Sequence, residues 1–379
     1  MGFFSSLGGI DPLSPRTATT IAAFVILCLI AMVVASRIFG IKFAPLFIPL
    51  RRRLQTLAVL ILFPSQLYAL VLFACITMFA PYGYAISAAY VAYMMLDKKP
   101  AKGGYPSSSW FKAVVVAFWR PLLRLFASYF PVEIIKTDDL DPTKRYIFGC
   151  HPHGVLSTGA FCAFCTDYCG FEQKYPGINL NVLTLKQTFK IPIFREFIMC
   201  HKLADCSKRS INYLLKKKGS AVLLVVGGAQ EALDTRPGTL DLTLKSRKGF
   251  VKQALRNGAR LVPVIVFGEN ELFSQLPNPK GSVVRAFQQL FKRIMGFSTP
   301  FFFGRGVFNY SFGLLPRRMP LHVVVGSPIK IADDDTPIQE PEQSVIDKVH
   351  AQYCEELVAL YNAHKEKFAK NRTREICIK

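Results

Sequence analysis

The N-terminal part of the chain is dominated by apolar runs that predict membrane-associated helices. Residues 57–96 contain no charged side chain over about forty positions, twice the length that one α-helix needs to cross a bilayer. Pro81 and Gly83 interrupt this run, so it predicts either a hairpin of two spans or a re-entrant wedge that turns within FAPYGY. Residues 19–36 are also uncharged, and they predict a retained helix rather than a signal peptide because the preceding region is poor in basic residues.

Basic residues flank both runs and predict which side of the membrane the chain occupies. They are Arg37, Lys42, Arg51, Arg52 and Arg53 between the runs, and Lys98, Lys99 and Lys102 after the second run. Because basic flanks stay in the cytoplasm, we expect the chain beyond residue 96 to be cytosolic. Residues 110–130 mix aromatic and aliphatic side chains with Lys112, Arg120 and Arg124, a pattern typical of a helix lying among lipid headgroups.

From residue 132 onward the pattern changes to short β-rich runs separated by amphipathic helical segments. The predicted strands are residues 145–150, 180–185, 221–226, 261–267 and 321–325, and a final helix is predicted over residues 341–368. This alternation predicts an α/β fold with a largely parallel sheet. The chain then divides into an N-terminal segment with a candidate membrane helix (1–56), a transmembrane or re-entrant hairpin (57–96), an interfacial amphipathic segment (97–131) and a cytosolic α/β domain (132–379).

Composition adds that the protein is both apolar and strongly basic. Apolar residues make up 51% of the chain, and its formal net charge is +22. This pairing favours a protein that lies partly in a membrane and turns its remaining surface toward anionic headgroups or an anionic substrate. We expect no nucleic-acid partner, because no nucleic-acid-binding motif accompanies the charge.

The candidate chemistry lies in two loops that follow predicted strands. YIFGCHPHG places His151 and His153 after one strand, and GGAQEALD places Gly227, Gly228 and Glu231 after another. Loops at the carboxyl ends of parallel strands share one edge of a sheet, so we expect both to face the same crevice. There an imidazole would take a proton from an attacking hydroxyl, a carboxylate would hold its tautomer, and glycine N–H groups would bind the oxyanion.

Neighbouring residues supply candidates for substrate binding. Gly154 lets a substrate or another backbone segment approach closely. Arg247, Lys248 and Lys252 stand at the start of a predicted helix, where their side chains either hold phosphates or form a solvated face.

Two other interpretations of the histidines stay open at this point. Cys162, Cys165 and Cys169 follow closely, so these side chains could form part of a zinc site. However, their spacing also fits one face of a helix and no second paired-ligand module exists, so we assign no metal site. Alternatively, both histidines only satisfy backbone groups in a turn that Pro152 stiffens.

Five sequence blocks together resemble the type 2 diacylglycerol acyltransferase family. They are YFP (129–131), YIFGCHPHG (146–154), VVGGAQEAL (225–233), RKGFVKQALRNGARLVPVIVFGENELF (247–273) and FGLLPRRMPLHVVVGSPI (312–329). The resemblance implies a membrane-anchored α/β acyltransferase domain, more distantly similar to glycerophosphate acyltransferases, in which HPHG is the active-site motif. It also implies that Glu269 and Asn270 line the crevice or brace it.

The distant similarity also ranks the candidate catalytic residues. The motif of glycerophosphate acyltransferases is a histidine and an aspartate separated by four residues. Counted from His151, the aspartate position is Leu156, so the acidic partner is expected elsewhere, at Glu231. Because His151 matches the histidine of that motif, it is expected to be the base ahead of His153.

The implied reaction transfers an acyl group from acyl-CoA to the hydroxyl of diacylglycerol, forming triacylglycerol at the endoplasmic reticulum membrane and the lipid droplet surface. The expected partners are acyl-CoA as co-substrate, diacylglycerol and membrane lipids, with no other cofactor. Monoacylglycerol and wax alcohols are further acceptors in this family. A non-catalytic lipid-droplet scaffold and a zinc-dependent hydrolase are the alternatives from other classes, and the oligomeric state, a homo-oligomer included, stays open.

Overall fold

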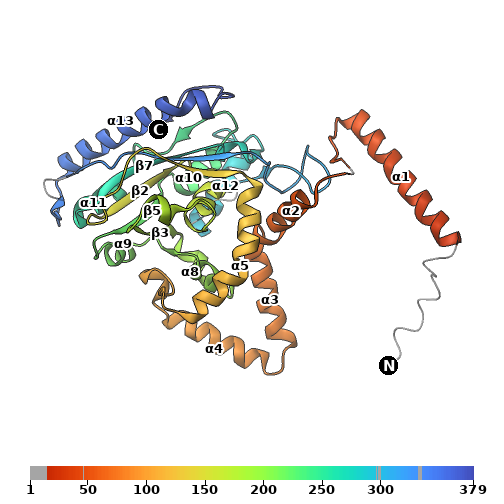
Figure 1. The fold of residues 1–379 in the computed structure, drawn as a ribbon, viewed down its shortest axis with the longest axis horizontal. Coiled ribbons are helices and arrows are strands. Elements are labelled where there is room, and N and C mark those ends of the chain that lie inside the picture. Colours follow the sequence, from red (N-terminus) through yellow and green to blue (C-terminus); the bar gives the residue numbers. More distant parts are fainter. Residues whose placement is uncertain (1–14, 46, 296, 298–299, 332–334) are drawn as a thin grey trace.

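A seven-stranded sheet forms the centre of the molecule (Figure 1). The computed structural model describes residues 15–379 apart from 46, 296, 298–299 and 332–334. The strand order is β1-β10-β7-β2-β5-β3-β4, and every neighbouring pair is parallel except β10 and β7. The predicted α/β fold with a largely parallel sheet is therefore confirmed.

The strands predicted from the sequence agree with the structure within one residue at each end. The strands are β1 (Val132–Lys136), β2 (Tyr146–His151), β3 (Asn179–Thr184), β4 (Leu203–Asp205), β5 (Ser220–Val225), β6 (Asp241–Leu242), β7 (Arg260–Phe267), β8 (Ser274–Gln275), β9 (Phe302–Phe303), β10 (Leu321–Val325) and β11 (Cys377–Ile378). The predictions correspond to β2, β3, β5, β7 and β10. The edge strands β1 and β4 were not predicted.

Helices cover both faces of the sheet. The helices are α1 (Pro15–Phe39), α2 (Leu50–Leu62), α3 (Ser65–Phe79), α4 (Gly83–Leu96), α5 (Trp110–Tyr129), α6 (Thr158–Phe164), α7 (Phe171–Lys174), α8 (Phe194–Cys200), α9 (Lys208–Leu214), α10 (Gly228–Asp234), α11 (Gly249–Asn257), α12 (Val283–Met295) and α13 (Gln343–Phe368), with short 3₁₀ helices at Lys99–Lys102, Lys186–Lys190 and Glu269–Glu271. One core packs α5, α6 and α8 against the sheet and includes Phe148, whereas the other packs α9, α11 and α13 and includes Ile147. Because β2 is buried on both faces, its sequence is a continuous apolar run.

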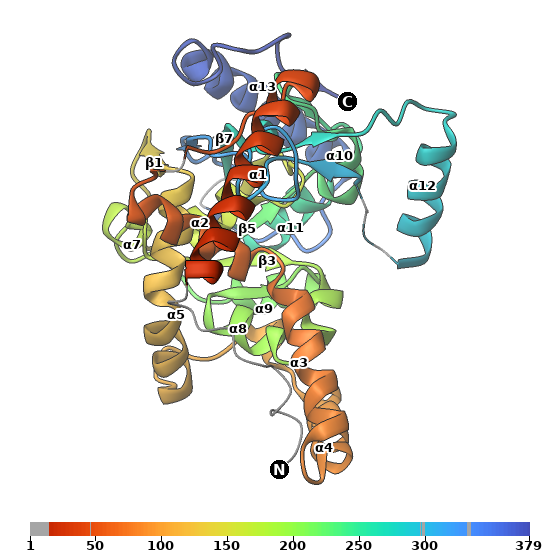
Figure 2. The ribbon, with the colours of Figure 1, turned by 90° about the vertical axis from the view of Figure 1, so that its right-hand side faces the viewer.

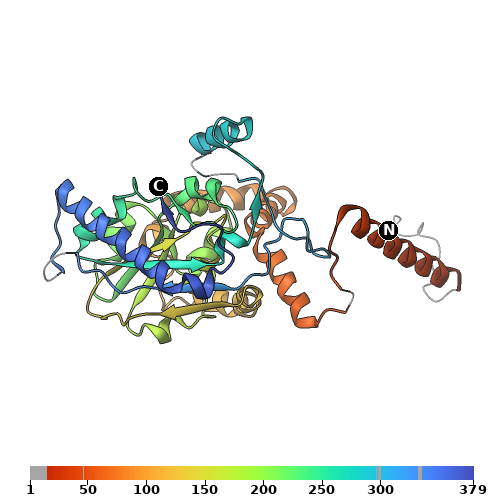
Figure 3. The same ribbon diagram turned by 90° about the horizontal axis from the view of Figure 1, so that it is seen from above.

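The N-terminal helices lie outside this sheet domain (Figures 1 and 3). The uncharged run folds as the end of α2 followed by α3 and α4, which pack together and are separated by a turn within FAPYGY, as predicted. Many of their large apolar side chains are exposed: Leu67, Leu70, Val71, Met78, Phe79, Ile86, Met95 and Leu96. Among the described residues, no single helix is both long and apolar enough to cross a membrane, but α2 and α3 together meet that criterion as a pair bent by 58°.

The YFP block anchors these helices to the sheet domain. Tyr129 is buried, and its hydroxyl donates a hydrogen bond to the carbonyl oxygen of Pro316 at 2.7 Å. The guanidinium of Arg318 lies 4.1 Å from the centre of the Tyr129 ring and also binds the side chain of Gln55 on α2. Two of the resemblance blocks, which contain Tyr129 and Arg318, therefore meet in a structural contact.

Candidate active site

The two predicted loops meet at the carboxyl edge of the sheet. β2 ends at His151, and its parallel neighbour β5 leads into α10, which carries Glu231. Glu231 Oε1 accepts a hydrogen bond from the backbone N–H of His153 at 2.5 Å, and Oε2 accepts one from the N–H of Thr243 at 2.8 Å. The carboxylate therefore holds the main chain of HPHG, whereas we had expected it to hold an imidazole ring.

Close packing explains Gly227 and backbone conformation explains Gly228, the two glycines before Glu231. A Cβ atom on Gly227 would lie 2.2 Å from the Glu231 carboxyl carbon, so no larger residue fits there. Gly228 has a φ of +62°, with open space where a side chain would stand. Burial raises the pKa of Glu231 to about 7, although the two N–H donors and Arg247 favour its ionised form.

His153 presents a neutral imidazole with one free nitrogen. Its Nδ1 lies 3.1 Å from the carbonyl oxygen of Gly154; because a carbonyl can only accept, Nδ1 carries the proton. Its Nε2 then bears the lone pair, and the described part of the chain gives that atom no hydrogen-bond partner. The residue is partly exposed, and burial of the ring lowers the pKa of His153. A group with these properties can act as a general base.

His151 is fully buried and oriented differently. Its Nε2 lies 3.0 Å from the hydroxyl of Tyr353 on α13, and that hydroxyl donates to the carbonyl oxygen of Gly149 at 3.1 Å. Since the phenol has only one proton to give, His151 Nε2 must donate to it, which leaves the buried Nδ1 without a partner. Burial lowers the pKa of His151 to about 3, so the ring stays neutral.

No motif in the sequence indicated the role of Tyr353. Its hydroxyl occupies the space that a Cβ atom on Gly149 would fill, since the two would be 2.0 Å apart. This contact explains why glycine precedes CHPHG.

Replacing Tyr353 with phenylalanine is expected to lower the free energy of unfolding by about 1–3 kcal/mol, because it leaves the His151 Nε2–H buried without a partner and removes the hydrogen bond to the Gly149 carbonyl. Denaturant unfolding measures the difference. Tyr175→Phe is the matched control, because Tyr175 is also buried but its hydroxyl has no hydrogen-bond partner. An equal effect of both substitutions would contradict the assigned hydrogen bonds.

Glu269 braces the other side of the HPHG loop. Its carboxylate accepts hydrogen bonds from the N–H groups of Thr158 at 2.8 Å and Gly159 at 2.7 Å, at the start of α6. Burial raises the pKa of Glu269 to about 7. A Cβ atom on Gly154 would lie 2.5 Å from Glu269 Cγ, so the predicted close approach at Gly154 is made by this side chain. Asn270 donates to the carbonyl oxygen of Thr239 at 2.8 Å, while its own buried Oδ1 has no partner.

The basic residues predicted at the start of a helix do stand at the start of α11. Arg247 is exposed, Lys248 pairs with Asp347 of α13 at 2.8 Å, and Lys252 lies in the first turn. Among the described residues, no hydrogen bond or ion pair joins them to the HPHG loop, although the charge of Arg247 acts on Glu231.

A cavity of about 280 Å³ lies beside the HPHG loop, and Pro152 and Asn270 form part of its wall. The segment at the C-terminal end of α13 contributes basic side chains to the same wall: Lys367, Lys370, Arg372 and Arg374. Arg372 pairs with Glu366 and Glu375, and Arg374 with Asp241. Lys367 and Lys370 have no carboxylate partner among the described residues. The sequence offered no motif that pointed to these two lysines.

The cysteines near the histidines pack into the core. Cys162 and Cys165 are buried, and burial raises the pKa of both thiols, while Cys169 donates weakly to the carbonyl oxygen of Val132. The described residues contain no group of three or more His, Cys, Asp or Glu side chains arranged to hold a metal ion.

Comparison with known proteins identifies the family. The family model for diacylglycerol acyltransferase matches residues 76–379. The chain is 41% identical to diacylglycerol O-acyltransferase 2A of Umbelopsis ramanniana, covering 88% of this chain and 93% of the relative, and 42% identical to diacylglycerol O-acyltransferase 2 of Dictyostelium discoideum, covering 88% and 98%. It is 44% identical to 2-acylglycerol O-acyltransferase 1 of Bos taurus, covering 86% and 96%. The chain therefore belongs to the diacylglycerol acyltransferase family.

Proposed function

We propose that this protein is an acyl-CoA:diacylglycerol O-acyltransferase that forms triacylglycerol. The observation that carries the proposal is the HPHG loop, where Glu231 fixes the main chain and His153 offers an unpaired Nε2. The names of the Umbelopsis and Dictyostelium relatives support diacylglycerol as the acceptor. The bovine relative, named for 2-acylglycerol, makes a monoacylglycerol acceptor the second candidate.

In the proposed reaction, Nε2 of His153 takes the proton from the acceptor hydroxyl as its oxygen attacks the thioester carbon of acyl-CoA. The new C–O bond forms, the C–S bond breaks, and the imidazolium returns the proton to the departing thiolate of CoA. The sequence ranked His151 first, but we assign the base to His153, because His151 is fully buried together with its free Nδ1, whereas His153 is partly exposed. Glu231 positions the loop, and the glycine N–H groups near α10 remain candidates for holding the oxyanion.

The base assignment predicts an acidic limb in the pH profile. Burial lowers the pKa of His153 below its ordinary value near 6.5, so the ring is neutral and active at pH 7. As the pH falls through this lowered pKa, the ring gains a proton and the rate should drop about tenfold per pH unit. Initial rates measured with saturating substrates test this, and an acidic limb centred above pH 7 would contradict it.

Acyl-CoA is proposed to place its phosphates in the cavity beside Pro152, where Lys367 and Lys370 have no carboxylate partner in the described part of the chain. Changing both lysines to alanine should raise KM for acyl-CoA by about tenfold or more and leave kcat nearly unchanged. Lys217→Ala with Lys218→Ala is the matched control, because these exposed lysines precede β5 at the opposite end of the strands. Equal KM values for the two double variants would exclude this cavity as the phosphate site.

We also propose that the protein lies in the endoplasmic reticulum membrane and on lipid droplets, with its α/β domain in the cytosol. The fold of that domain is proposed to be similar to that of glycerophosphate acyltransferases. The exposed apolar side chains of α3 and α4 support membrane insertion of this hairpin, and the net charge of +22 suits a surface that faces anionic headgroups.

An acceptor competition assay tests the proposed function. Purified protein in phospholipid vesicles is given one labelled acyl-CoA together with equal amounts of diacylglycerol, monoacylglycerol and a long-chain alcohol. Triacylglycerol is expected as the main product from diacylglycerol. A preference for monoacylglycerol would favour the second candidate, and no transfer to any alcohol would favour the non-catalytic scaffold.

A further inference from the structure

Helix α12 exposes its apolar side. Val283, Phe287, Leu290 and Ile294 recur at intervals of three and four residues and therefore share one face. Their side chains are 87%, 52%, 54% and 71% exposed. A surface helix of a soluble domain normally turns such a face toward the core.

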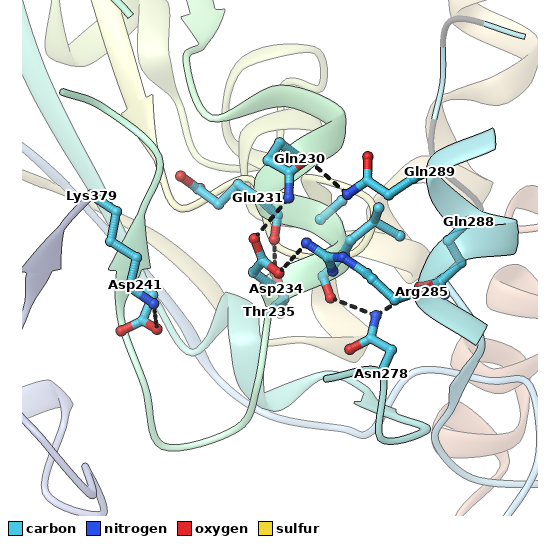
Figure 4. Close-up of polar contacts among 12 residues, drawn as sticks. Gln230, Glu231, Asp234, Thr235, Asp241, Asn278, Arg285, Gln288, Gln289 and Lys379 are labelled. Atoms are coloured by element: carbon cyan, nitrogen blue, oxygen red, sulfur yellow. Dashed lines mark hydrogen bonds and ion pairs between the residues drawn. The ribbon is translucent and has the colours of Figure 1, made fainter. Parts of the chain in front are cut away.

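The polar side of α12 is the side that packs against the protein (Figure 4). Arg285 forms an ion pair with Asp234 at 2.8 Å, and Gln289 and Lys292 both bind the side chain of Gln230. Arg285 and Gln288 are buried in this contact, and Gln288 accepts a hydrogen bond from Asn278 at 2.7 Å. Since Gln230 and Asp234 belong to α10, the contact runs along the helix that carries Glu231. The orientation of α12 is thus fixed by specific polar contacts.

The apolar surface extends beyond α12 to residues 301–314. This segment also exposes large apolar side chains: Phe301, Phe303, Phe308, Phe312 and Leu314. The rings of Phe287 and Phe301 stack with centres 6.3 Å apart. The segment pairs with the connection between α1 and α2, because Ala44 N–H donates to Phe308 at 2.8 Å and Tyr310 N–H donates to Lys42 at 2.7 Å. The exposed apolar face therefore continues toward the N-terminal helices.

We propose that α12 and residues 301–314 form a lipid-contact surface, by which the catalytic domain lies on the leaflet that holds its acceptor. Figures 2 and 3 show α12 standing off from the sheet domain, where a flat surface can reach it. The exposed Lys280 shortly precedes α12 and the exposed Arg293 lies on it, and both suit anionic headgroups. A second copy of this strongly basic chain would instead bring like charges together.

The lipid-contact surface deepens the proposed function, on which it rests, by stating where the acceptor enters. The polar contacts between α12 and α10 join this surface to the helix that holds the HPHG loop through Glu231. A diacylglycerol in that leaflet would approach His153 from the α12 side.

Site-specific photocrosslinking tests the contact without relying on activity. The full-length protein carries p-benzoylphenylalanine in place of Phe287 and is placed in vesicles of phosphatidylcholine and phosphatidylserine containing a clickable phospholipid. We expect a lipid adduct from this position and none from the same label in place of Glu355, which is exposed on α13. Crosslinks to a second copy instead of lipid, or equal lipid labelling at both positions, would overturn the proposal.

A paired activity assay tests the consequence for catalysis. Phe287→Glu with Leu290→Glu should lower transfer to long-chain diacylglycerol in vesicles at least about tenfold, while transfer to a water-soluble short-chain diacylglycerol stays unchanged. The control adds two glutamates to the exposed side of α13, at Ala359 and Asn362. Equal losses on both substrates, or an equal effect of the control, would overturn the proposed entry route. Failure of the wild-type protein to transfer any acyl group would instead contradict the proposed function.

Discussion

Replacing His153 with alanine is expected to lower kcat for acyl transfer by about 10²–10⁴-fold, the range over which a general base contributes to catalysis. The substitution removes the imidazole whose Nε2 has no partner, while the backbone N–H that binds Glu231 remains. The side chain is partly exposed, so the loss of packing is small. Initial rates with labelled acyl-CoA and diacylglycerol give kcat, and thermal unfolding shows whether the fold is retained.

The matched control for this experiment is His364→Ala. His364 lies on α13, is also partly exposed, and donates from Nδ1 to the carbonyl oxygen of Leu360 at 3.0 Å, so its ring has the same protonation pattern as that of His153. Among the described residues its hydrogen bond and ring contact are both within α13, away from the HPHG loop. A kcat of the His153 variant within about tenfold of the control would exclude His153 as the base.

His151→Ala separates the two histidines by its effect on stability. His151 is fully buried and binds Tyr353, so its removal leaves a cavity and takes away one of the two hydrogen bonds of the Tyr353 hydroxyl. We therefore interpret a combined loss of activity and stability at His151 as structural, in contrast to the selective loss of kcat expected at His153.

The features predicted correctly from the sequence are those that depend on local patterns. The strands β2, β5 and β7 are buried on both faces, so each is a continuous apolar run between turn residues. Because parallel strands end at one edge of a sheet, the HPHG loop and Glu231 were predicted to meet there, and the structure shows them in contact. The edge strands were missed because β1 is half exposed and β4 has only three residues.

The features that were not predicted depend on contacts between distant residues. Tyr353 and His151 are 202 positions apart, and periodicity can place Tyr353 on the inward face of α13 without directing its hydroxyl. Motif comparison likewise favoured His151 as the base, because it cannot show that this ring is fully buried. The amphipathic pattern of α12 does not reveal which side faces the protein, whereas its contacts with Gln230, Asp234 and Asn278 do.

The two buried carboxylates give the HPHG loop its shape from opposite sides. Glu231 holds the N–H of His153, and Glu269 fills the space beside Gly154 while binding the start of α6. Both have a pKa raised by burial to about 7, and the N–H donors offset part of the cost of ionising them. Both carboxylates bind main-chain N–H groups, and Gly154 lies between these groups in the sequence. A change in the backbone conformation of Gly154 would therefore move the loop away from one carboxylate or the other.

Gly154→Ala is therefore expected to lower the free energy of unfolding by about 3 kcal/mol or more and to abolish most acyl transfer. The φ of +60° costs an alanine roughly 1–2 kcal/mol. The new Cβ would also stand 2.5 Å from Glu269 Cγ, which forces Glu269 away from the N–H groups of Thr158 and Gly159. Each buried N–H left unpaired costs a further 1–3 kcal/mol, roughly. Denaturant unfolding and initial rates measure the two effects.

Gly40→Ala separates the strain at Gly154 from the clash. Gly40 has nearly the same φ, +63°, but nothing lies within 4 Å of the position that its Cβ would take. The Gly40→Ala variant should therefore lose only about 1–2 kcal/mol of unfolding free energy, which is the cost of the strained backbone, and keep its acyl-transfer activity. Backbone strain is common to both substitutions. The additional loss of unfolding free energy in the Gly154→Ala variant therefore measures how firmly Glu269 holds the loop. If the two variants lost equal stability and both kept kcat, Glu269 could not be the brace that positions His153.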